Sequence, residues 1–136
     1  LAKIISNSSE REAFMVQKYH HPKKEYRLLV LGNDIGAYER KVPIKGEFRG
    51  NVKLGAKEVF YEIDKTPIKM REIALKAAKT LKLEVAGVDI LEEEGSGKLW
   101  LLEANRGPGL TYDPETSPEL SQMARFFARE LGVRRV

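Results

Sequence analysis

Three polar side chains interrupt apolar runs in the second half of the sequence: Asp89, Glu103 and Asn105. Apolar runs at 85–91 and 99–102 flank Glu-Gly-Ser-Gly-Lys at 94–98, which predicts a β-hairpin. If the hairpin turns about Ser96, the opposed pairs are Asp89 with Glu103, Leu91 with Leu101 and Gly87 with Asn105. Because successive side chains of a strand point to opposite faces, the three polar residues share one face.

Two carboxylates that face each other across a hairpin repel, because their Cβ atoms lie only about 4.5–5.5 Å apart. A cation would remove this conflict. Mg²⁺ takes hard oxygen ligands, needs only one or two protein carboxylates, and completes its shell with water and phosphate oxygens. Gly87, opposite Asn105, leaves room for such a ligand. We therefore predict a metal site at Asp89, Glu103 and Asn105. Two alternatives stay open: Asp89 is an ordinary solvated residue, or a shift of one residue in register separates the three.

A basic segment precedes these residues. Residues 47–55 alternate, and an extended chain there would present Arg49, Asn51 and Lys53 on one side. Arginine offers a planar fork of donors that suits phosphate or carboxylate, and nearby glycines allow the backbone to approach a ligand. The pattern predicts an anion-binding strand. The alternative is a solvent-facing loop edge.

Other charged residues have less specific patterns. Arg27 and Arg40 lie in a predicted hairpin, where either is an ion-pair partner of Glu25 or Glu39, or a phosphate ligand. The adjacent histidines at 20 and 21, beside a proline, are expected to be solvated rather than to bind a metal.

The elements that must position these residues alternate between strands and helices. Strands are expected at 2–5, 14–19 and 58–63, hairpins at 26–31 with 35–40 and at 85–91 with 99–102, and an irregular segment at 41–55. One helix is expected with Thr66 as N-cap and Pro67 at its first position, and a second from Ser117-Pro118 to Gly132. We expect a single α+β domain over 1–136, with a mostly antiparallel sheet and helices packed on one face.

Composition limits the class of protein. The chain has 136 residues, 42% hydrophobic and 32% charged, which is ordinary for one globular domain. No apolar run is long enough to span a bilayer, and the absence of cysteine fits a cytoplasmic location. A net charge of +4 suits an anionic partner. No aromatic-rich RNA-binding motif is present, so a nucleic-acid-binding domain is the weakest of the functional hypotheses. The strand-like start at Leu1 predicts a piece of a longer protein.

Five segments in this order resemble landmarks of the ATP-grasp superfamily. They are Val16-Gln17-Lys18-Tyr19, Tyr26 to Val30, Phe48 to Asn51, Val85 to Leu91, and Leu102 to Asn105 with Pro108-Gly109-Leu110. The nearest branch is the RimK-like ligases, which include ribosomal-protein glutamate ligases. The last two landmarks, at their mutual spacing, are the specific ones.

The resemblance implies a fold in which two α+β subdomains hold ATP between them, this chain being the C-terminal part without the N-terminal subdomains. It implies a reaction in which a substrate carboxylate attacks the γ-phosphate and an amine takes the resulting acyl phosphate. Asp89, Glu103 and Asn105 would bind the magnesium ions, with manganese as an alternative ion. The partners implied are ATP, a small carboxylate or peptide substrate, an amino-acid acceptor and the N-terminal subdomain.

The resemblance also assigns roles to residues around the nucleotide. Arg49 and Asn51 would hold the γ-phosphate and the acyl phosphate, and Arg27 would clamp a phosphate or the substrate carboxylate. The residues expected beside the adenine and ribose are Gln17, Lys18, Tyr19 and Glu25. A second hypothesis, from another class, is a non-catalytic nucleotide- or metal-binding module completed by another chain. The acceptor and a homo-oligomeric state are left open.

Overall fold

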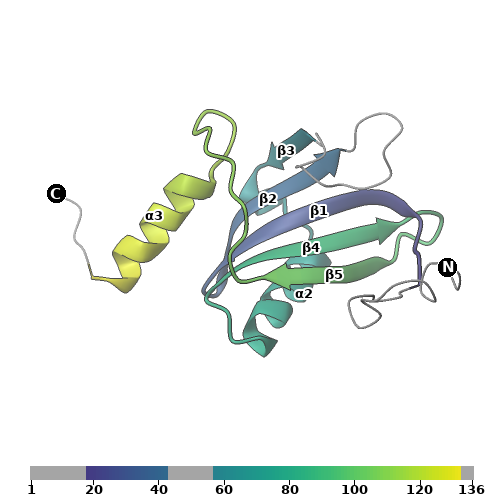
Figure 1. The fold of residues 1–136 in the computed structure, drawn as a ribbon, viewed down its shortest axis with the longest axis horizontal. Helices are drawn as coiled ribbons and strands as arrows, with labels where there is room; N and C mark the ends of the chain where they lie inside the picture. Colours follow the sequence, from purple (N-terminus) through teal and green to yellow (C-terminus); the bar gives the residue numbers. More distant parts are fainter. Residues whose placement is uncertain (1–17, 43–56, 133–136) are drawn as a thin grey trace, which may run out of the picture.

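The computed structural model describes residues 18–42 and 57–132. Its elements are β1 (Pro22–Leu31), β2 (Asp34–Val42), β3 (Lys57–Tyr61), the short 3₁₀ helix η3 (Ile63–Lys65), α2 (Ile68–Thr80), β4 (Val85–Glu93), β5 (Leu99–Asn105) and α3 (Glu119–Glu130). The described strands form one antiparallel sheet in the order β3-β2-β1-β4-β5 (Figure 1). The expected α+β class is confirmed. No helix within the described ranges is long and apolar enough to cross a membrane.

The first hairpin joins β1 to β2 through a tight turn at Gly32 and Asn33. Gly32 has φ 62°, a left-handed conformation that glycine adopts without a steric penalty. The strand pairing shifts between Leu29 and Val30, so the ladder contains an irregularity. The predicted hairpin is confirmed, although β1 already begins at Pro22, before the predicted start of the strand at residue 26.

Helix α2 covers one face of the sheet. Its buried side chains are Met70, Ala74, Ala77 and Ala78, and they join the cluster that contains Leu28, Val30, Val88 and Ile90. The apolar residues recur at helical spacing, so one stripe of the helix faces the sheet. Thr66 was expected to cap this helix. Instead, its hydroxyl donates to the carbonyl oxygen of Ile63 at 2.6 Å, and the helix begins at Ile68 without a side-chain cap.

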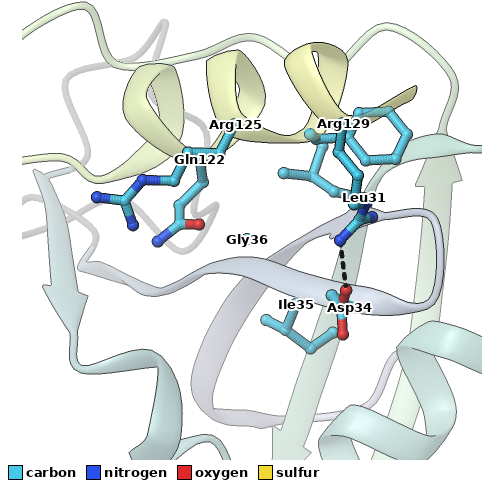
Figure 2. Close-up of a pocket in the computed structure, with 8 residues that line it drawn as sticks. Leu31, Asp34, Ile35, Gly36, Gln122, Arg125 and Arg129 are labelled. Carbon is cyan, nitrogen blue, oxygen red and sulfur yellow. Dashed lines mark hydrogen bonds and ion pairs between the residues drawn. The ribbon is translucent and has the colours of Figure 1, made fainter. Parts of the chain in front are cut away.

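Helix α3 packs on the opposite face, near the β1–β2 turn (Figures 1 and 2). Its Phe126 joins Leu29, Leu31 and Ala37 in a second cluster, whereas Leu28 belongs to the cluster under α2. Leu28 and Leu29 are neighbours on β1, so their side chains point to opposite faces of the sheet. The expectation that helices pack on one face is therefore wrong. The physical reason is that β1 is apolar on both faces over 28–31, so both need cover.

A shallow pocket lies between α3 and the first hairpin (Figure 2). Arg129 spans its rim and its Nη1 lies 3.4 Å from Oδ2 of Asp34. Gly36 forms part of the floor, and a Cβ there would stand 2.4 Å from the side chain of Leu31. A side chain at position 36 would therefore force the Leu31 side chain to shift.

The β4–β5 hairpin has the predicted register on its polar side. The confirmed pairs are Asp89 with Glu103 and Gly87 with Asn105. The register then shifts after Asp89, so Leu91 opposes Trp100 and the predicted pairing of Leu91 with Leu101 is wrong. A bulge of this kind adds one unpaired residue, which a count from the turn cannot reveal.

Gly87 is buried, and its missing side chain serves a different purpose from the one predicted. A Cβ at this position would lie 2.6 Å from Cβ of Pro108. The space beside Gly87 is thus taken by the proline that follows β5, and the expectation of room for a metal ligand there is wrong. The close approach fixes the course of the chain leaving β5.

Candidate functional site

Charged and amide side chains cross the sheet on the face that α3 covers. This polar row consists of Glu58 on β3, Glu39 and Lys41 on β2, Arg27 on β1, Asp89 on β4, and Glu103 and Asn105 on β5. The register explains the gathering, because Arg27 pairs with Glu39 on one side and with Asp89 on the other. Side chains of directly opposed residues lie on the same face.

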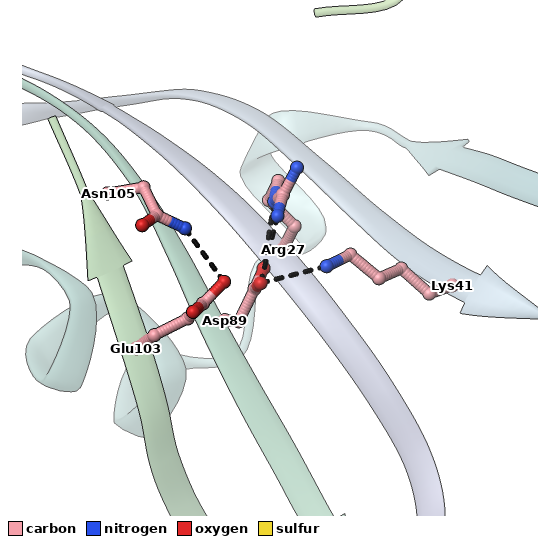
Figure 3. Close-up of polar contacts among 5 residues, drawn as sticks. All are labelled: Arg27, Lys41, Asp89, Glu103 and Asn105. Carbon is pink, nitrogen blue, oxygen red and sulfur yellow. Dashed lines mark hydrogen bonds and ion pairs between the residues drawn. The ribbon is translucent and has the colours of Figure 1, made fainter. Parts of the chain in front are cut away.

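Asp89 is the best-bonded member of the polar row (Figure 3). Arg27 Nε donates to its Oδ1 at 2.8 Å and Nη2 to its Oδ2 at 2.9 Å, while Lys41 Nζ donates to Oδ2 at 2.8 Å. Burial would raise the pKa of Asp89, but the hydrogen bond from Arg27 and the charge of Lys41 outweigh it and hold the pKa below its ordinary value. The same hydrogen bond raises the pKa of Arg27. Asp89 is therefore an anion at neutral pH.

Glu103 and Asn105 form a separate, more exposed pair on the edge strand β5. Asn105 Nδ2 donates to Glu103 Oε1 at 2.7 Å (Figure 3). The expected conflict between Asp89 and Glu103 is relieved here by Arg27 and Lys41. No group of three or more histidine, cysteine or acidic side chains that could hold a metal occurs in the described part of the chain. Two carboxylates and one amide oxygen are nevertheless a hard-oxygen donor set that suits Mg²⁺ in type.

Glu39 differs from every other acid of the polar row in its surroundings. It is 2% exposed, and neither of its carboxyl oxygens accepts a hydrogen bond from a described residue. Burial, together with the charges of Glu58 and Glu119, raises its pKa to about 8, against the opposing charges of Arg27 and Lys41. The sequence offered Glu39 only as a partner for an arginine. In the structure, Arg27 bonds to Asp89 instead.

A family comparison decides what kind of domain carries this polar row. The profile of the RimK-like ATP-grasp domain matches residues 1–119, most of the chain. The chain belongs to the RimK-like ATP-grasp family. The expected resemblance is thereby confirmed.

Curated relatives of this RimK-like chain are named ligases. A ribosomal protein bS6–L-glutamate ligase of Escherichia fergusonii is 41% identical over 98 residues, covering 71% of this chain and 31% of that protein. A probable α-L-glutamate ligase of Citrobacter koseri is 42% identical over 87 residues, covering 64% of this chain and 27% of the relative. The chain thus spans about a third of the length of these relatives.

Solved structures share the fold. An ATP-grasp ligase associated with ribosomally synthesised peptides from Chryseobacterium gregarium, solved with ADP and a leader and core peptide, has a TM-score of 0.62 at 16% identity, over 88% of this chain and 36% of that one. The ATP-grasp ligase PsnB, solved with a precursor variant, Mg and ADP, has a TM-score of 0.58 at 20% identity, over 83% and 35%. At these identities the likeness concerns the fold alone.

The other residues predicted to bind the nucleotide in this RimK-like chain lie in different parts of the sequence. Glu25 lies on β1 in register with Lys41, two residues before Arg27, and so shares the polar face. Lys18 and Tyr19 are exposed just before β1. Gln17, Arg49 and Asn51 lie outside the described residues.

Arg40 does not belong to the site. It pairs with Tyr26, whose side chain belongs to the cluster under α2. Directly opposed side chains share a face, so Arg40 lies on the α2 face. Arg27 and Arg40 therefore point to opposite faces of the sheet, and a phosphate role for Arg40 stays a prediction. Sequence alone left the choice open because the register of the first hairpin was not fixed by its turn.

Glu119, at the start of α3, is a buried acid that the sequence did not single out. Its Oε2 accepts from the backbone nitrogen of Thr111 at 2.7 Å and from Ser117 Oγ at 3.0 Å. The Thr111 hydroxyl also donates to Glu58. Burial and the charge of Glu58 raise the pKa of Glu119, outweighing these hydrogen bonds. These contacts tie α3 and β3 to the polar row. A Ser-x-Glu spacing ahead of a helix was the available signal.

His20 has partners that the sequence did not reveal. Its ring lies 4.1 Å from that of Trp100, and Nδ1 lies 2.7 Å from Oε1 of Glu93. The hydrogen bond with His20, assisted by Ser96, lowers the pKa of Glu93 to about 2. The expectation of a solvated His20 is wrong, because its side chain is only 18% exposed and is held between Trp100 and Glu93. The contact anchors the stretch before β1 to the second hairpin.

Proposed function

We propose that this chain is the C-terminal, magnesium- and ATP-binding part of an ATP-dependent carboxylate–amine ligase. The observation that carries the proposal is the juxtaposition of Asp89 with Glu103 and Asn105 on adjacent strands, beside the cations Arg27 and Lys41. Acidic ligands for a divalent ion next to fixed positive charges form a surface that suits a nucleotide triphosphate. Family membership and the names of the relatives support this assignment.

The reaction proposed has two displacement steps. An oxygen of a substrate carboxylate attacks the γ-phosphorus of ATP, and the bond to ADP breaks, which yields an acyl phosphate. The nitrogen of an amine then attacks the acyl carbon and loses a proton, and inorganic phosphate leaves. Both steps build negative charge on oxygen, so their main requirement is positioning and electrostatic stabilisation.

The roles proposed for the chain follow from position and charge. Asp89, Glu103 and Asn105 would hold Mg²⁺, or Mn²⁺ in its place, and the ion would neutralise phosphate charge. Arg27, fixed at the centre of the sheet, would hold a phosphate or carboxylate oxygen. Arg49 and Asn51 are proposed to hold the transferred phosphoryl group.

Nucleotide contacts are proposed for the segment that leads into β1. Gln17, Lys18 and Tyr19 would flank the adenine, and Glu25 would reach the ribose. The acceptor is proposed to be an amino acid and the donor a carboxylate on a small molecule, peptide or protein, because relatives are named for a ribosomal protein substrate and a structural neighbour holds leader and core peptides. The rest of the protein would close the ATP site, and a cytoplasmic location is proposed.

The test is magnesium-dependent ADP release by the full-length protein with a panel of amino-acid acceptors. Asp89→Asn and Glu103→Gln should each lower kcat by about a hundredfold, since they remove charge from the metal site. Glu94→Gln makes the same charge change in the exposed turn of the same hairpin and should leave the rate unchanged. Turnover that survives both site substitutions would refute the metal assignment. Tight ATP binding without turnover on any acceptor would indicate a non-catalytic module instead.

A further inference from the structure

A metal ion at Asp89 would meet two fixed cations, because Arg27 and Lys41 already donate hydrogen bonds to both carboxylate oxygens. Arg27 occupies Oδ1 and Oδ2, and Lys41 adds a second bond to Oδ2. Repulsion between a divalent ion and the guanidinium would favour movement of Arg27 away from Asp89. The question is where a guanidinium that is 15% exposed can go without losing its countercharge.

The register supplies one answer. Arg27 has an acid directly opposite on each neighbouring strand, Asp89 on β4 and Glu39 on β2. The two acids lie on the same face as Arg27, with Cβ atoms of opposed pairs about 4.5–5.5 Å apart. An arginine side chain spans that distance to either side by changing rotamers, without backbone movement.

Glu39 is an acceptor without a donor. It is 2% exposed, and both carboxyl oxygens lack a hydrogen-bond partner among residues 18–42 and 57–132. Buried acceptors of this kind are uncommon because they lose their bonds to water and gain none. The negative charges of Glu58 and Glu119 crowd Glu39 further, so an approaching guanidinium would relieve both deficits.

We propose that Glu39 is a positioning residue that receives Arg27 when a divalent cation takes Asp89. The inference rests on the proposed function, in which Asp89 is a metal ligand. Arg27 exchanges its two bonds to Asp89 for bonds to Glu39, and Glu39 gives its proton to solvent as the guanidinium arrives. Lys41 contacts Oδ2 alone, so the departure of Arg27 leaves Oδ1 of Asp89 free for the cation. In the absence of the cation, Arg27 keeps Asp89 neutralised and in place.

Metal affinity is the first measurement. Binding of Mn²⁺ to the full-length protein with a non-hydrolysable ATP analogue is followed by electron paramagnetic resonance. Glu39→Gln keeps the shape but removes the negative charge that would receive Arg27, so it should weaken Mn²⁺ binding by at least about tenfold, the size seen for outer-shell substitutions at metal sites. Glu39→Asp should restore part of the loss. Glu62→Gln removes the same charge at an exposed position just after β3 and should cost less than about threefold.

The second measurement observes Arg27 itself. In ¹⁵N-edited spectra, the Nε–H signal of Arg27, assigned through Arg27→Lys, should shift when Mg²⁺ and the analogue bind the wild type and should stay unchanged in Glu39→Gln. Equal weakening by Glu39→Gln and Glu62→Gln, or a wild-type Arg27 signal that does not respond to Mg²⁺, would overturn the exchange.

Failure of the proposed function has a different signature. If Asp89→Asn leaves Mn²⁺ affinity unchanged, the metal assignment itself is wrong. If Asp89→Asn weakens binding while Glu39→Gln does not, only the partner exchange is wrong. Glu39→Gln is close to isosteric and removes a buried carboxyl, so its Tm should not fall, which separates both outcomes from misfolding.

Discussion

Arg27 on β1 donates two hydrogen bonds to Asp89 on β4, from Nε at 2.8 Å and from Nη2 at 2.9 Å. The pair lies near the centre of the sheet, and Asp89 is only 9% exposed. Removal of one member of a buried pair leaves the other charge without compensation, which costs more than the pair contributes when both are present. The pair is therefore both a structural contact and the means by which Asp89 is held.

Truncation of Arg27 should destabilise the protein. In Arg27→Ala, Lys41 is the one remaining side chain in the described ranges that donates a hydrogen bond to Asp89. The free energy of unfolding should therefore fall by about 3 kcal/mol. Arg27→Lys keeps the charge but loses the fork, so its loss should be smaller, about 1 kcal/mol. Urea unfolding of the full-length protein measures both. Arg125→Ala, at an exposed arginine of α3, is the matched control and should stay within about 0.5 kcal/mol. A loss below 1 kcal/mol in Arg27→Ala would show that the pair is dispensable.

Gly87 should tolerate no side chain. In Gly87→Ala, the new Cβ would stand 2.6 Å from Cβ of Pro108, so the chain after β5 must shift, at a cost of about 1–3 kcal/mol in the free energy of unfolding. Gly107→Ala introduces the same atom where nothing lies within 4 Å and should leave stability unchanged. Thermal unfolding of the two variants side by side checks this. Equal Tm values would mean that the loop of Pro108 adapts freely.

The sequence predicted contacts that depend on neighbouring residues and missed those that depend on distant ones. The turns around Gly32 and Ser96 carry strong local signals, and the pairing of Asp89 with Glu103 follows from turn position and the two-residue period of a strand. The bulge after Asp89 carries no such signal. The partnership of Arg27 with Asp89 joins residues 62 positions apart, and the strand order that brings them together cannot be read from either hairpin alone.

Glu39 should make stability depend on pH. The pKa of Glu39 is raised from 4.5 to about 8, so the folded protein keeps a proton that the unfolded chain releases. Stability is therefore lost as pH rises from about 4.5 to about 8. Glu39→Gln removes this loss, and its advantage over wild type should grow by at least about 1 kcal/mol between pH 5 and pH 8, since each pKa unit corresponds to about 1.4 kcal/mol. Chemical unfolding across this range measures the advantage, with Glu94→Gln as control. An advantage that is constant with pH would contradict the raised pKa.

His20 should affect nucleotide binding more than catalysis. Its ring packs on Trp100 and its Nδ1 meets Glu93, so it fixes the stretch containing Lys18 and Tyr19 against the second hairpin. If that stretch flanks the adenine, His20→Ala should raise the KM for ATP about three- to tenfold, because ordering the stretch then costs entropy on binding, while kcat changes little. Lys23→Ala, which removes an exposed ion pair on the same approach to β1, should alter neither constant. A fall in kcat at unchanged KM would place His20 in the chemical step instead.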